Sequence, residues 1–254
     1  MRCTILGCGG SLGVPQLLCS CYVCTSKNPK NIRKRTSIFI EQGGTNILID
    51  TSQDFKIQAQ MYKIDKINGL LLTHEHSDHI CGINDIKPYW YSSDGKIDAY
   101  LNKQTFDSIS GTFSYLFKNN SSIHQPILNP IVIDDYSEFT VGNVQVSSFL
   151  QHHGQINSLG YRFGNFAYST DFNALPQKSI EALRGIDTWV IGCLRYGWSP
   201  THLSVEQALD YIEIIKPKRA FFTHMSHDID FDEITKILSP NVRPAYDGMV
   251  IELE

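Results

Sequence analysis

The sequence of 254 residues contains no long hydrophobic run. Its apolar stretches, such as GLLL at 69–72 and AFF at 220–222, are far shorter than the roughly 20 residues of a membrane-spanning helix. The start, MRCTILGCGGSLG, lacks the charged segment, apolar core and cleavage site of a signal peptide. We therefore expect a cytoplasmic protein that has no contact with a membrane.

An excess of positive charge is also missing, since the formal net charge is −4. This balance argues against a broad basic face that wraps nucleic acid. The only dense basic stretch is KNPKNIRKR at 27–35, which is typical of a solvated loop. A nucleic-acid partner is therefore not favoured, although this local patch keeps it open. The sequence also leaves a homodimer open.

Disulfides are not expected among the seven cysteines of a cytosolic chain. Four are scattered beside apolar residues and are interpreted as buried, inert thiols; they are Cys3, Cys8, Cys81 and Cys193. The other three, Cys19, Cys21 and Cys24, have the spacing C-x-C-x2-C. Three thiolates make most of a tetrahedral zinc site and need one more ligand, for which His227 is the best candidate.

Short β-branched and apolar segments alternate with helical patterns along the whole chain. Segments 2–7, 36–41 and 45–50 are predicted strands, and helical spacing follows at 55–64 and again at 103–118. No linker or repeat is visible, so we expect one domain over residues 1–254. Its strands, mostly antiparallel, should form a sandwich of two sheets covered by helices.

Two local signals predict where elements end. Pro88 is expected to stop a short helix that begins near residue 80. Asp247-Gly248 is expected to turn a C-terminal hairpin within residues 242–253.

The segment THEHSDH at 73–79 places four metal-ligating side chains in seven positions. His74 and His76 are two residues apart, so on an extended segment they point the same way and can bind one ion. Asp78 and His79 come where a helix should begin, so their side chains point elsewhere. Imidazole and carboxylate suit zinc, manganese or iron, and this pattern favours two neighbouring ions.

This signature resembles that of the metallo-β-lactamase superfamily, and the further motifs follow in that family's order. NILIDTS matches the first motif, LQHHG supplies a histidine, YSTD supplies an aspartate and FFTHMSH supplies the last histidine. The resemblance implies an α/β fold, namely the αββα sandwich of two mixed sheets flanked by helices. It also implies two divalent metal ions, Mn²⁺ or Zn²⁺. One ion would be held by His74, His76 and His153, and the other by Asp78, His79 and His224. Asp171 would bridge both ions. Asp50 would hold the ligands in place without touching either ion. His153, which precedes glycine, is preferred over His152.

Two features resemble the PhnP-like phosphodiesterase branch of the superfamily. The first is the cysteine loop, at about 15–30, which together with His227 implies a structural zinc. The second is His202 in SPTHLSVEQAL, which matches the additional histidine of that branch. The expected reaction is hydrolysis of a small phosphodiester, such as a cyclic ribosyl phosphate, by a metal-activated hydroxide. Asp78 would orient the hydroxide, and a cationic His202 would stabilise charge and protonate the leaving oxygen.

Other functions remain open. The same ligands suit tRNA 3′-processing, although no Gly/Pro-rich arm for gripping tRNA is present. A thioester or lactam hydrolase would not need His202 or the cysteines. A metal-binding or redox module without hydrolytic activity would not need the complete ligand series. Segment 84–135 does not match the PhnP pattern, so it leaves the substrate undecided.

Overall fold

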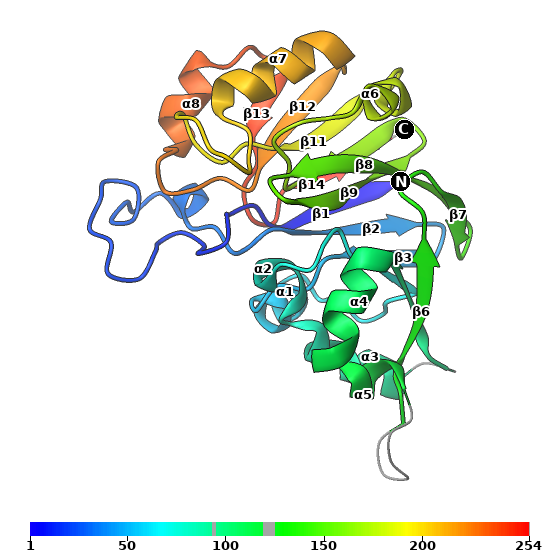
Figure 1. Cartoon of the computed structure of the whole chain (residues 1–254). Coiled ribbons are helices and arrows are strands. Elements are labelled where there is room, and N and C mark those ends of the chain that lie inside the picture. The colour runs from blue at the N-terminus through cyan, green and yellow to red at the C-terminus, as the bar shows by residue number, and fades with distance from the viewer. Residues whose placement is uncertain (93–94, 119–124, 254) are drawn as a thin grey trace.

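The computed structural model describes residues 1–92, 95–118 and 125–253. Two mixed β-sheets pack face to face, and helices cover the outer face of each (Figure 1). This architecture confirms the predicted αββα sandwich. None of the helices within those ranges is long and apolar enough to cross a membrane.

The first sheet is formed by the N-terminal half of the chain and its last strand, in the order β14-β1-β2-β3-β4-β5-β6. Strands β14 to β3 pair antiparallel, whereas β3 to β6 pair parallel. The strands are β1 (Arg2–Gly7), β2 (Ser37–Gln42), β3 (Thr45–Ile49), β4 (Gly69–Leu71), β5 (Ile97–Asn102), β6 (Leu128–Ile133) and β14 (Val250–Glu252).

The second sheet has the order β13-β12-β11-β10-β9-β8-β7. Strands β10 to β13 pair parallel, and β7 to β10 pair antiparallel. The strands are β7 (Glu138–Val141), β8 (Val144–His153), β9 (Ile156–Phe163), β10 (Phe166–Ser169), β11 (Thr188–Gly192), β12 (Arg219–Thr223) and β13 (Val242–Pro244).

Two clusters of buried apolar side chains hold these layers together. The larger includes Ile38 and Ile49 of the first sheet and Phe149 and Trp189 of the second, so it fills the space between the sheets. The smaller lies under the helices of the first sheet and includes Phe55. The helices are α1 (Phe55–Met61), α2 (Ser77–Ile80), α3 (Lys87–Tyr91), α4 (Lys103–Thr112), α5 (Ser114–Phe117), α6 (Gln177–Leu183), α7 (Val205–Ile215) and α8 (Phe231–Ile237), with short 3₁₀ turns at Pro29–Asn31 and Ile83–Ile86.

Several local predictions were wrong. The strands are not mostly antiparallel, because helices connect parallel neighbours in half of each sheet. Pro88 lies in the first turn of α3, where its missing N–H costs nothing, so it begins a helix and does not end one. The helix predicted over 103–118 breaks at Phe113, after Gly111 and Thr112, which are weak helix formers.

The C-terminal segment does not form a hairpin. Val242–Pro244 pairs with β12 in the second sheet, whereas Val250–Glu252 pairs with β1 in the first. The Asp247-Gly248 turn therefore passes the chain from one sheet to the other. Each of the two short strands pairs with a longer strand of its own sheet, β12 or β1, and not with the strand on the other side of the turn. The interpretation of Cys81 as buried was also wrong, since it is exposed directly after α2.

The ends of the strands bring the candidate residues to one edge of the sandwich. Asp50 follows β3, Asp171 follows β10, and His224 follows β12. Asp50 and His224 have positive φ angles of 62° and 58°. Non-glycine residues rarely adopt this conformation, and it is concentrated at functional sites. The chain therefore turns sharply at two of the predicted site residues.

A substitution of Gly192, at the end of β11, tests how closely the backbone is packed at this edge of the sandwich. A Cβ atom there would lie 2.0 Å from the carbonyl oxygen of Thr170, the residue before Asp171. We expect Gly192→Ala to lower the free energy of unfolding by about 1–3 kcal/mol, because the strand must move to relieve the contact. Gly197→Ala is the matched control, since no atom lies within 4 Å of the added methyl. Urea unfolding of both variants measures the difference, and equal stabilities would contradict the expectation.

Candidate metal centre

The buried carboxylate of Asp50 lies next to the cluster of ligand-type side chains and fixes the orientation of its neighbours. Its carboxylate accepts hydrogen bonds from the Thr73 N–H and hydroxyl, both at 2.8 Å, and lies 2.7 Å from Nδ1 of His79. Since a carboxylate accepts, His79 donates from Nδ1 and presents Nε2 to the site. Burial raises the pKa of Asp50, although His79 and Thr73 oppose the shift.

The first group of ligand atoms comes from His74, His76, His153 and Asp171, which all lie within 4.8 Å of one another. Nε2 of His153 is 3.2 Å from Nδ1 of His76 and 3.6 Å from Oδ2 of Asp171. Nδ1 of His153 donates to the carbonyl oxygen of Thr201 at 2.7 Å, which fixes Nε2 as the free nitrogen. The four side chains therefore converge on one point.

The second group consists of Asp78, His79, Asp171 and His224, also within 4.8 Å. Nε2 of His79 and Nε2 of His224 each lie 3.3 Å from Oδ1 of Asp171. The same nitrogens lie 3.4 and 3.5 Å from Oδ2 of Asp78. Asp171 thus turns Oδ1 toward this group and Oδ2 toward the first, which is the geometry of a bridging ligand.

The unsatisfied atoms of the site fit two cations. Nε2 of His74 and Nε2 of His79 are fully buried and have no hydrogen-bond partner within the described parts of the chain. Leaving such atoms unpaired is costly, and a coordinated ion would remove that cost. The donor set of imidazoles and carboxylates suits zinc or manganese.

The protonation states point to the same conclusion. Burial lowers the pKa of His74 well below its usual value, which keeps the imidazole neutral. Burial would raise the pKa of Asp171, but His224 and His79 outweigh it and hold that pKa well below its usual value. Burial also opposes protonation of His79, yet the carboxylates of Asp171 and Asp78 raise its pKa well above the usual value. Buried carboxylates therefore favour positive charge at this site. A metal ion would compete with the proton that makes His79 cationic.

His202 lies beside both groups. Its Nδ1 is 3.7 Å from Oδ2 of Asp171, and its ring stacks on His224 with centroids 4.8 Å apart. Burial lowers the pKa of His202 to about 3, although Asp171 opposes the shift. Burial therefore favours the neutral imidazole over the cation, and the role of His202 in charge stabilisation and proton donation stays a prediction.

The structure distinguishes the two adjacent histidines of LQHHG. His153 belongs to the first group, whereas His152 is exposed and its Nδ1 lies 3.1 Å from the side-chain oxygen of Asn157. Sequence reasoning missed the carbonyl of Thr201 and the hydroxyl of Thr170, which donates to Asp171 at 2.7 Å. No pattern of residue types could have found a backbone carbonyl.

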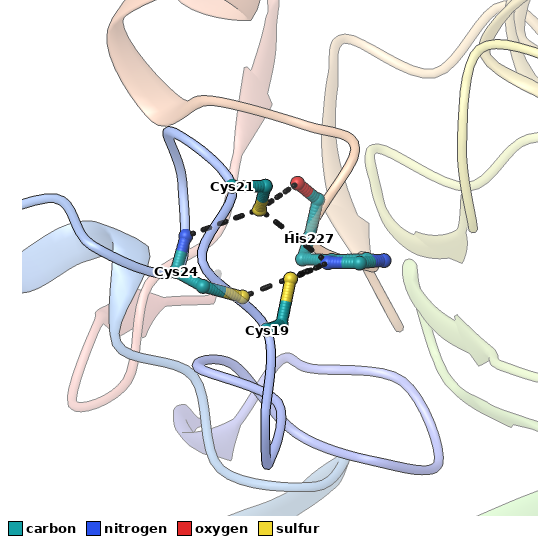
Figure 2. Close-up of side chains that lie close together, drawn as sticks. All are labelled: Cys19, Cys21, Cys24 and His227. Atoms are coloured by element: carbon teal, nitrogen blue, oxygen red, sulfur yellow. Dashed lines mark hydrogen bonds between the residues drawn. The ribbon is translucent and has the colours of Figure 1, made fainter.

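The second candidate site lies on the loop between β1 and β2, which extends away from the two sheets (Figure 1). Figure 2 shows Cys19, Cys21 and Cys24 pointing toward His227. Their sulfur atoms lie 3.2, 3.5 and 3.6 Å from Nδ1 of the histidine. The backbone N–H of Cys24 donates to Cys21, and this is the main reason why the pKa of Cys21 falls to about 6. Three sulfurs and one nitrogen in this arrangement suit tetrahedral zinc.

Arg33 connects this loop to the segment that carries His227. Its buried guanidinium donates to the carbonyl oxygens of Ser226 and Ile229 at 2.9 and 2.7 Å. Asn31 also donates to Asp230 at 2.7 Å. The cysteine loop is therefore hydrogen-bonded to residues that lie before and after the candidate zinc ligand His227 in the sequence.

Comparisons with known proteins agree with this architecture. A family model described as "Beta-lactamase superfamily domain" matches residues 45–225. An "Octanoyltransferase" of Porphyromonas gingivalis is 35% identical over 253 residues, which are 98% of this chain but 51% of that protein. The chain thus spans about half the length of the curated relatives that lead this comparison.

Solved structures are similar over the whole chain. A crystal structure of "a New Diphosphatase from the PhnP Family" has a TM-score of 0.93 and 33% identity, covering 100% of this chain and 98% of that one. Zn²⁺-bound PqqB from Methylobacterium extorquens has a TM-score of 0.81 with full coverage of both chains, but its 18% identity shows the fold alone.

Asp171→Ala tests the bridging geometry. The variant should retain fewer ions in the histidine site, because both ligand groups lose the same carboxylate, while zinc among the cysteines stays. Elemental analysis after dialysis gives the metal content per chain. Asp187→Ala removes a carboxylate that pairs with exposed Lys218 and serves as the control. Unchanged metal content in Asp171→Ala would refute the bridge.

Cys21→Ser tests the thiolate site. We expect the loss of one zinc per chain and a decrease of about 3 kcal/mol in the free energy of unfolding, because a tightly bound ion stabilises only the folded state. Cys81→Ser, which changes an exposed thiol outside the cluster, should change neither quantity. The assignment fails if Cys21→Ser retains all its zinc and its stability.

Proposed function

The chain belongs to the metallo-β-lactamase superfamily, in its PhnP-like branch, and on that premise we propose that this metal-dependent hydrolase is a phosphodiesterase for a small substrate such as a cyclic ribosyl phosphate. The observation that carries the proposal is the shared carboxylate of Asp171, whose two oxygens face separate ligand groups beside His202. Two cations held a few ångströms apart suit both the attacking and the leaving oxygen of an in-line displacement.

We propose the following ligands, which combine the two groups with the expected roles. His74, His76 and His153 hold one divalent ion, Asp78, His79 and His224 hold the other, and Asp171 bridges them. The ions are Mn²⁺ or Zn²⁺. Cys19, Cys21, Cys24 and His227 hold a structural zinc with no open position, so it stabilises the fold and takes no part in the reaction.

When bound, the two ions would lower the pKa of a shared water and neutralise charge on the phosphoryl oxygens. The residues around them supply orientation. Asp78, whose pKa is held well below its usual value by His79 and His224 against the effect of burial, can accept a hydrogen bond from the attacking water. Thr201 and Asp50 hold His153 and His79 in the tautomers that leave Nε2 free.

His202 is the proposed hydrogen-bond donor to the reacting phosphate or to the leaving oxygen. As a neutral imidazole it donates one N–H, which stabilises developing charge without carrying charge itself. A water oriented by this side chain can supply the proton that the leaving oxygen needs.

A second candidate is hydrolysis of a diphosphate linkage. It is supported by the 33%-identical solved structure, which is that of a protein described as a diphosphatase. Cleavage of a phosphoanhydride uses the same nucleophile and the same charge stabilisation. It differs in its leaving group, which is a phosphate and needs less help from a proton donor.

The name octanoyltransferase belongs to a relative about twice as long as this chain, so it assigns no acyl transfer here. A substrate panel on metal-loaded protein separates the candidates: ribosyl 1,2-cyclic phosphate, 2′,3′-cyclic nucleotides, a nucleoside diphosphate derivative, precursor tRNA and an octanoyl thioester. Preference for either of the first two supports the phosphodiesterase proposal. Turnover of the thioester alone would refute it.

His202→Ala tests the role of the donor. Turnover of a phosphodiester with a poor leaving group should fall roughly a hundredfold, because one donor to the transition state is lost. Metal content should not change, since His202 lies outside both ligand groups. His152→Ala is the control, because His152 is the exposed neighbour of a proposed ligand. Equal rates for the His202 variant and the unchanged protein would remove this role.

A further inference from the structure

The carboxylate of Asp171 belongs to both ligand groups, so its orientation decides the geometry of both. Rotation about the bond between Cβ and the carboxylate carbon would turn Oδ1 and Oδ2 away from their separate groups. This torsion has only a broad preference in aspartate, so it does not by itself hold the two oxygens in place. A bridging carboxylate therefore needs a neighbour that fixes its plane.

The hydroxyl of Thr170 is such a neighbour. It donates to Oδ1 of Asp171 at 2.7 Å, and both residues are only 1% exposed, so water does not compete for this hydrogen bond. The imidazole nitrogens around the carboxylate lie farther away, between 3.3 and 3.8 Å. Among the residues that the structure describes, the hydroxyl thus makes the closest of these polar contacts with the carboxylate.

The second sheet holds Thr170 itself in place. Thr170 directly follows β10, and its carbonyl oxygen lies so close to Gly192 of β11 that a Cβ atom there would be 2.0 Å away. The hydroxyl of Ser158, on β9, donates to the carbonyl oxygen of Asp171 at 2.5 Å. Three neighbouring strands therefore fix the backbone that carries the Thr170 hydroxyl.

The hydrogen bond from Thr170 does not act equally on the two ligand groups. It is made to Oδ1, the oxygen that lies 3.3 Å from Nε2 of both His79 and His224 in the second group. Oδ2 faces His153 in the first group and does not accept this hydrogen bond. Loss of the hydroxyl would therefore remove support from the oxygen that serves the second group, whereas the first group would keep its three imidazoles.

We propose that Thr170 is a positioning residue that holds Asp171 in its bridging orientation, and that the ion of the second group depends on it most. This inference rests on the pair of ions in the proposed function and adds a residue that is not itself a ligand. Removal of a hydrogen-bond partner of a metal ligand typically lowers metal affinity about tenfold to a hundredfold. The ion held by Asp78, His79 and His224 should show this loss.

Thr170→Val tests the proposal, because valine has the shape of threonine but cannot donate a hydrogen bond. The metal-loaded protein is dialysed against buffers of graded free Zn²⁺ concentration, and elemental analysis gives the ions retained per chain. In Thr170→Val, half-occupancy of one ion in the histidine site should require about tenfold to a hundredfold more free Zn²⁺. Zinc among the cysteines should not change, and Thr170→Ser, which keeps the hydroxyl, should bind both ions as the unchanged protein does.

Thr223→Val is the matched control. Thr223 is also fully buried at the end of a strand, directly before the proposed ligand His224, but its hydroxyl has no hydrogen-bond partner within the described ranges. The same chemical change should therefore leave both metal affinities unchanged. Anomalous diffraction from Thr170→Val at an intermediate Zn²⁺ concentration shows which ion remains, and we expect the one beside His74, His76 and His153.

The proposal is overturned if Thr170→Val retains both ions as the unchanged protein does, or if it loses the ion of the first group instead. It is also overturned if Thr170→Ser or Thr223→Val shows the same loss. Thr170→Ala, which cannot overfill the site, gives the same comparison if the valine variant does not fold.

The outcome also separates this inference from the proposed function. A single ion in the histidine site of the unchanged protein would contradict both. Two ions that Thr170→Val binds normally would overturn the role of Thr170 alone. Failure of the metal-loaded protein to hydrolyse a phosphodiester would contradict the proposed function without affecting the metal titration.

Discussion

The structure depends most on how three buried carboxylates, Asp50, Asp78 and Asp171, are compensated. All three are nearly inaccessible to water, and Asp171 alone lies within 4 Å of five imidazole rings. Burial of a charged group is costly unless opposite charge and hydrogen bonds accompany it. Hydrogen bonds satisfy Asp50, but the buried nitrogens of His74 and His79 remain unpaired. Two cations are the simplest way to satisfy the whole cluster.

The sandwich supplies the rigid frame that this cluster requires. Residues from both sheets meet at one edge because the strands that carry them end there, and the apolar core between the sheets fixes the sheets against each other. The segment after β12 carries both His224 and His227, so the metal centre and the cysteine cluster share one support. The buried guanidinium of Arg33 links this segment to the N-terminal loop.

Much of the site could be predicted from the sequence, because ligand-type residues crowd into 73–79 and the others follow predicted strands. The fold class followed from the same motifs. The C-terminal hairpin could not be predicted correctly, since Asp247-Gly248 indicates a turn but does not say which strands pair. Likewise, Thr201 contributes a backbone carbonyl, which every residue possesses.

The central claim is that Asp171 bridges two metal ions while a third ion sits among the cysteines. Anomalous diffraction from crystals of the metal-loaded protein, recorded at the zinc and manganese absorption edges, tests it most directly. The account predicts two peaks on opposite sides of the Asp171 carboxylate, roughly 3.5–4 Å apart, and a separate zinc peak between Cys19, Cys21, Cys24 and His227. A single peak or none beside Asp171, or a cysteine cluster without zinc, would contradict it.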